Sequence, residues 1–112
     1  MSEEKESKIQ SMRFLEQSIQ NLILQKQAFE IELTETESAL KEIEKSGEDV
    51  FKIIGQLMIK TEKSKIKEEL LSKEKILKLR INALEKQEES FVKQLEKIRE
   101  EVIASKNKNS RE

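Results

Sequence analysis

Two long stretches of the chain place apolar residues alternately three and four positions apart, and this repeat constrains the fold more than any other feature. The first stretch is interrupted only by Lys26 and Thr36, and the second only by Glu74 and Glu88. A repeat of about 3.5 residues is typical of helices that pack in a coiled coil. In each stretch these positions form a stripe along one side of the helix, which we call the seam. The first seam is Met12, Leu15, Ile19, Leu22, Lys26, Phe29, Leu33, Thr36, Leu40 and Ile43; the second is Leu70, Glu74, Leu77, Ile81, Leu84, Glu88, Phe91, Leu95, Ile98 and Val102.

No proline interrupts either stretch, and the positions between the apolar ones are mostly good helix formers. We therefore predict one domain over residues 1–112, with helices at about 8–46 and 63–105 and a disordered tail at 106–112. Each helix would extend on the order of 60 Å. Gly47 suits a left-handed position after the first helix, and Thr61 with Glu62 suits the start of the second.

The two predicted helices are nearly equal in length and the break between them is short. We therefore expect them to fold back as an antiparallel two-helix coiled coil, which forms the arm of the subunit. This fold-back brings Lys26 and Glu88 to core-type positions in adjacent layers. We predict an ion pair between them that fixes the register of the helices. The alternative is that both long side chains extend to solvent.

The break itself contains the run FKIIGQLMIK, residues 51–60, which is rich in β-branched residues around Gly55-Gln56. We predict one β-hairpin over residues 50–61, with a type II′ turn, because glycine suits its first central position. In that register Ile54 pairs with Leu57 and Ile53 with Met58, which leaves apolar side chains on both faces. A continuous helix through this run is the less favoured alternative, because glycine and β-branched residues are poorer helix formers.

An isolated hairpin is marginally stable in water, and its two unpaired edges invite further strands. We therefore expect hairpins from several subunits to join into a closed β-barrel platform from which the helices project. The residues assigned to assembly are Phe51, Ile53, Ile54, Leu57, Met58 and Ile59.

Charge and composition argue against several classes of function. The 22 basic residues nearly cancel 23 acidic ones, so neither nucleic-acid binding nor electrostatic membrane docking is expected. The chain has no histidine and no cysteine, which removes the commonest general base and the commonest metal ligands. We predict a cytoplasmic protein that is not an enzyme and has no cofactor and no metal site.

Several segments resemble the β-class subunits of the archaeal-type prefoldin family. The resemblance is carried by Gly55-Gln56-Leu57-Met58-Ile59-Lys60-Thr61, then Lys65-Ile66-Lys67-Glu68-Glu69-Leu70, then Leu79-Arg80-Ile81-Asn82-Ala83-Leu84-Glu85-Lys86-Gln87-Glu88. It extends from about Ile9 to Ile103, and the single hairpin fits the β class, since α-class subunits carry two. Phe51 stands where the family commonly has an aromatic residue with a hydroxyl.

The resemblance implies a hexamer of two α-class and four β-class subunits, whose hairpins form the platform. It also implies ATP-independent capture of unfolded client proteins between the arms, and their delivery to a group II chaperonin. The alternative function is a structural coiled-coil scaffold or tether that binds no clients.

Client capture is assigned to the free ends of the arms, where a coiled coil frays and seam residues lose their covering partners. Apolar side chains on such a support can bind many non-native chains weakly, and several arms acting together gain from effective concentration. The alternative is that the terminal residues simply complete the seam. The predicted client-binding residues are Ile9, Met12, Phe14, Val102 and Ile103.

Overall fold

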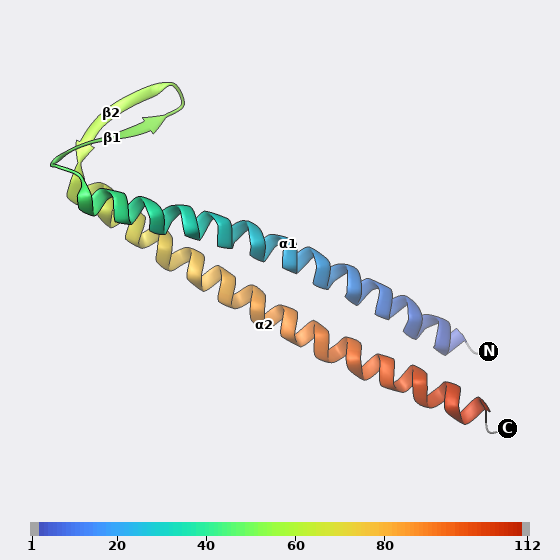
Figure 1. The fold of residues 1–112 in the computed structure, drawn as a ribbon. Helices are drawn as coiled ribbons and strands as arrows, with labels where there is room; N and C mark the ends of the chain where they lie inside the picture. The colour runs from blue at the N-terminus through green and yellow to red at the C-terminus, as the bar shows by residue number, and fades with distance from the viewer. Residues whose placement is uncertain (1–2, 111–112) are drawn as a thin grey trace. The chain divides into compact units, whose positions relative to one another are not determined.

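Two long helices with a two-stranded antiparallel hairpin between them make up the fold, as the sequence predicts (Figure 1). The computed structural model describes the backbone of residues 3–110 and the side chains of residues 3–105. Helix α1 spans Glu3–Lys45, strand β1 Asp49–Ile54, strand β2 Leu57–Glu62 and helix α2 Lys63–Ser110.

Both helices are longer than the sequence predicts. Helix α1 begins at Glu3 rather than at residue 8, and α2 continues to Ser110 where a disordered tail is expected from residue 106. Neither extension contains a proline or a glycine, so nothing in the local sequence stops either helix. The remainder of the predicted tail, residues 111 and 112, lies outside the described residues.

The heptad seams account for the burial pattern. All twenty predicted seam positions are buried or half-buried, and none is exposed, whereas most positions between them face solvent. Leu77 is the most buried apolar residue, at 2 % exposure. Thr36, the polar interruption of the first seam, is also buried, and its hydroxyl donates a hydrogen bond of 2.8 Å to the Glu32 carbonyl. Helical back-bonding of this kind lets threonine occupy a core position without an unsatisfied polar group.

Contacts divide the chain into two units. The terminal unit comprises residues up to Lys26 together with those from Ala83 onward, and the hairpin unit comprises Gln27–Asn82. In the terminal unit α1 and α2 pack antiparallel. Their core is formed by Leu15, Ile19 and Leu95, with Met12, Ile23, Phe91 and Ile98 packed against it.

In the hairpin unit, β1 and β2 pair in the predicted register. Ile54 pairs with Leu57, and Ile53 with Met58. Gly55 has a φ of 60°, and no residue other than glycine has a positive φ among those described. A type I′ turn would need positive φ at Gln56 as well, so the turn is of the predicted type II′.

The end of α1 differs from its prediction. Gly47 does not adopt the left-handed conformation. Among the described residues, positive φ occurs at Gly55 alone. The terminal carbonyl groups find other donors instead: the Ser46 hydroxyl donates a 2.8 Å hydrogen bond to the Ile43 carbonyl. The Lys63 ammonium, at the start of α2, donates a 2.8 Å bond to the Ser46 carbonyl. Together with the Ser46 amide, which donates a 3.3 Å bond to the Ile43 carbonyl, they supply donors at the helix end without a left-handed glycine.

Candidate functional site

The β-hairpin presents all six predicted assembly side chains to solvent. Their exposed fractions run from 44 % at Ile59 to 70 % at Ile53. Because side chains alternate along a strand, Ile53 and Met58 lie on one face and Ile54 and Leu57 on the other. A single copy therefore leaves both faces of the ribbon apolar and uncovered, which is the usual mark of an interaction surface.

An ion pair links the hairpin to the beginning of α2. Lys52, on β1, forms an ion pair with Glu69 at 3.1 Å. On the same unit an open groove is lined by the ribbon and both helices, and its apolar residues are Ala39, Ile43, Val50, Phe51, Ile66 and Leu70. The sequence reasoning missed Glu69 and this groove, because no local pattern indicates which way a hairpin bends over its helices.

The predicted client-binding residues, all in the terminal unit, fall into two groups. Phe14 and Ile103 are 70 % and 52 % exposed, so both offer apolar surface to solvent. Ile9, Met12 and Val102 are half-buried, and Met12 packs against the terminal core. Phe14 also borders a shallow groove with the buried Leu15 and with Phe91 and Ile98, two seam residues that are only half-buried. Part of the predicted set therefore continues the seam, and part is free for contacts with a partner.

Lys26 and Glu88 contact each other across the terminal unit. The Lys26 ammonium lies 3.2 Å from a Glu88 carboxylate oxygen, and each side chain is only 23 % exposed. The helix register inferred from the seams thus brings the two charges together rather than sending both to solvent. Partial removal from water strengthens their attraction and also raises the cost of leaving either charge alone.

A second cross-helix pair, Lys67 with Glu44, lies near the hairpin. The hydrogen bond from the Lys67 ammonium, reinforced by its positive charge, lowers the pKa of the Glu44 carboxyl below its ordinary value of 4.5. A carboxyl whose folded pKa is lowered stabilises the fold above its unfolded pKa, and loses that contribution as pH falls through the folded pKa.

Replacement of Glu44 by glutamine should therefore lower the thermal midpoint of unfolding at pH 7. It should have no effect at pH 2, where the Glu44 carboxyl is protonated and is as neutral as the glutamine amide. Midpoints from circular dichroism at the two pH values would check this. A deficit of equal size at pH 2 would show that the pair acts through something other than charge.

Two kinds of site are absent from the part of the chain that the structure describes. No group of three or more acidic side chains there is arranged to hold a metal ion. Over the same residues, neither helix contains an apolar stretch long enough to cross a membrane.

Comparison with known proteins places the geometry in context. The model of the family "Prefoldin subunit" matches residues 6–109. The prefoldin subunit beta of Thermococcus onnurineus is 42 % identical over 89 residues, which cover 78 % of this chain and 77 % of that protein. That of Pyrococcus furiosus is 36 % identical over 92 residues, covering 80 % and 79 %. The crystal structure of the prefoldin beta subunit from Thermococcus strain KS-1 matches with a TM-score of 0.86, 32 % identity and coverage of 93 % of both chains.

Proposed function

Because this chain belongs to the prefoldin family, in its β class, we propose that it is a subunit of an ATP-independent chaperone that captures unfolded proteins and passes them to a group II chaperonin. Prefoldin subunits are chaperone subunits, so the coarse function follows from the family. The steps of capture and delivery are the proposal. We also propose that the two units act as one prefoldin-like domain in the cytoplasm.

The observation that carries the assembly part of the proposal is the uncovered hairpin. Six apolar side chains stand on both faces of a ribbon whose two edges are unpaired in a single copy. Joining edges with other hairpins would satisfy the backbone groups and bury one face at the same time. We propose that α-class subunits and further β copies supply those hairpins, in a hexamer of two α and four β chains.

Client capture is proposed for the terminal unit. Phe14 and Ile103 expose apolar surface near the ends of the chain, and the groove beside Phe14 adds partly accessible aromatic and aliphatic groups. Such weak apolar sites suit partners that share no sequence, because unfolded chains have apolar segments in common. With several arms around one client, the weak contacts reinforce one another.

The second candidate function is a structural scaffold or tether. An exposed hairpin would serve a scaffold as well as a chaperone, so assembly does not separate the two. Exposed Phe14 favours the chaperone, because a scaffold that binds one folded partner needs no apolar side chain at 70 % exposure near its terminus.

Removal of residues 1–12 and 103–112 from the assembled complex should abolish its protection of a denatured protein against aggregation. In the full-length chain, replacing Phe14 and Ile103 by serine should raise the amount of complex needed for equal protection by about tenfold, because each arm loses the two exposed members of the predicted client-binding set. Light scattering of a diluted, denatured client measures both effects.

Leu71→Ser is the matched control, since Leu71 is 47 % exposed but belongs to the hairpin unit. It should leave protection unchanged. Full protection by the truncated complex, with the number of subunits unchanged, would exclude residues 1–12 and 103–112 as the client site.

A further inference from the structure

One segment of the terminal unit is nearly free of charge. Residues 9–25 of α1 carry only Arg13 and Glu16, whereas residues 83–105 of α2 carry ten charged side chains. The chain as a whole is 40 % charged. Glutamine, asparagine and serine occupy most of the exposed positions of this α1 segment, so its surface differs in kind from the rest of the molecule.

Nine positions share one outward side of α1 in this unit, and none of them carries a charge. They lie three, four, seven, ten or eleven residues from Phe14, which are the spacings that bring residues to one side of a helix. Eight of the nine side chains are exposed, and Ser18 is half-buried. We call this set the uncharged face: Ser7, Gln10, Ser11, Phe14, Gln17, Ser18, Asn21, Leu24 and Gln25.

The shallow groove beside Phe14 continues the uncharged face towards α2. Within the face, the Gln17 amide nitrogen donates a 3.3 Å hydrogen bond to the Asn21 amide oxygen. On the α2 side of the groove, the Gln94 amide donates a 3.3 Å hydrogen bond to the Ser90 hydroxyl. The groove itself is lined by apolar and uncharged polar side chains: Ser7, Gln10, Ser11, Phe14, Leu15, Phe91, Gln94 and Ile98.

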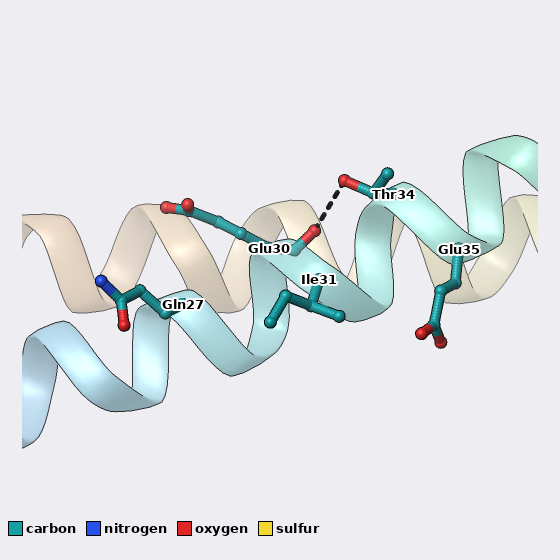
Figure 2. Close-up of a pocket in the computed structure, with 5 residues that line it drawn as sticks. All are labelled: Gln27, Glu30, Ile31, Thr34 and Glu35. Carbon is teal, nitrogen blue, oxygen red and sulfur yellow. Dashed lines mark hydrogen bonds between the residues drawn. The ribbon is translucent and has the colours of Figure 1, made fainter.

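An exposed apolar residue of the hairpin unit, on the same helix, has different surroundings. Ile31 is 63 % exposed, close to the 62 % of Leu24. Figure 2 shows Ile31 between Glu30 and Glu35 in a shallow pocket. Neither glutamate has an ion-pair partner among the side chains that the structure describes. A neutral chain that covered Ile31 would therefore remove two unpaired carboxylates from water, which is costly.

Charge thus decides what can cover each surface. A charged side chain under a neutral partner loses its water without gaining a counter-charge. Amide and hydroxyl groups, in contrast, exchange hydrogen bonds with water for hydrogen bonds with peptide groups at little net cost. The uncharged face is therefore matched in charge to a neutral polypeptide, whereas the surroundings of Ile31 are not.

We propose that the uncharged face binds extended, uncharged segments of client proteins, with Phe14 and Leu24 as two apolar anchors. The inference rests on the proposed function and deepens it in two ways. It adds Leu24, Gln17 and Asn21 to the residues that contact clients. It also names the class of client segment, which has apolar side chains at a fixed spacing and no charge between them.

The spacing of the anchors sets the spacing in the client. Phe14 and Leu24 are ten residues apart on α1, which corresponds to about 15 Å along the helix. Two side chains four residues apart on an extended chain are about 13 Å apart and point to the same side. Gln17 and Asn21 lie between the anchors, where the peptide groups of such a segment would pass, and each amide keeps donors or acceptors for them beyond their mutual bond.

Fluorescence anisotropy of labelled peptides with the assembled complex tests the inference. The reference peptide is uncharged and has two leucines four residues apart among serines and glutamines. Leu24→Ser should weaken its binding about tenfold, because one anchor is lost. Ile31→Ser is the matched control of equal exposure and should leave binding unchanged. A peptide with its leucines two residues apart should bind the parent complex about tenfold more weakly than the reference, because it reaches only one anchor.

Gln17→Glu together with Asn21→Glu tests the requirement for neutrality without removing apolar surface. Both positions are exposed and glutamate is a good helix former, so the helix should be retained, which circular dichroism checks. The reference peptide should bind this variant about tenfold more weakly, because covering the new carboxylates removes them from water. A peptide with two lysines between its leucines should lose less, because it supplies counter-charges.

Equal binding of the reference peptide by the parent, Leu24→Ser and Ile31→Ser complexes would overturn the inference, and so would equal losses in the two variants. Binding that disappears as salt is added would also overturn it, because charge would then hold the peptide. In each of these cases, a complex that still protects a denatured client leaves the proposed function intact. A complex that protects no client would overturn both.

Discussion

Replacing Ile53 and Met58 together by threonine should release the chain from its complex as a monomer. The two residues form a cross-strand pair on one face of the hairpin, and they are 70 % and 68 % exposed in a single copy. Threonine keeps the β propensity of the strands but removes most of the apolar surface. The single copy should therefore keep its fold and lose only what the contact with other copies supplies.

The size of the effect follows from burial. Covering an Ile or Met side chain contributes about 1.5–3 kcal/mol, so two residues contribute about 3–6 kcal/mol for each copy. Association should then weaken by a factor of about 10²–10⁴, enough to dissociate a micromolar complex.

Sedimentation equilibrium measures the mass of the doubly substituted chain directly. Leu24→Thr is the matched control, because Leu24 is 62 % exposed on α1 and its replacement should leave the mass unchanged. If the chain with both hairpin substitutions still sediments at the mass of the parent complex, this face has no role in assembly.

The second large effect concerns the ion pair in the seam. Replacing either Lys26 or Glu88 by leucine should lower the free energy of unfolding by about 2 kcal/mol, less than the roughly 3–5 kcal/mol for a fully buried pair, because both side chains keep partial access to water. Each single variant leaves one charge unpaired among the apolar residues of the seam. Replacing both should recover this loss or exceed it, since a leucine layer continues the seam.

Denaturant unfolding of the wild type, both single variants and the double variant at one protein concentration gives the coupling energy. Lys93 and Glu89 are the matched control: they pair at 3.7 Å within α2, but their side chains are 75 % and 68 % exposed. Replacing either should cost no more than about 0.5 kcal/mol. Equal, small losses at both pairs would mean that Lys26 and Glu88 are effectively solvated.

The fold was predictable because its main determinants are local. The 3.5-residue repeat identified all twenty seam positions, and Gly55 fixed the turn and with it the pairing of Ile53 with Met58. What the sequence could not provide depends on the direction of approach in three dimensions. The Lys52 to Glu69 pair and the Lys63 bond to the Ser46 carbonyl both join residues that the hairpin separates in the sequence, so no local pattern predicts them.

The wrong prediction for Gly47 has the same origin. A glycine after a helix suits a left-handed cap when local donors are lacking, but Lys63 arrives from a distant part of the sequence and supplies one. For the terminal residues, periodicity placed Met12 in the seam without showing how far the core extends. The structure shows Met12 in contact with that core and Phe14 outside it, so Phe14 becomes the stronger candidate for client contact.

The central claim is that the uncovered hairpin compels this chain to assemble. Its most direct test is the native mass of the purified chain, measured with and without an α-class subunit across a range of concentrations. We expect a species of several copies, reaching six chains when the α-class subunit is present. A stable monomer under both conditions, with the hairpin exposed and the chain still folded, would contradict the account.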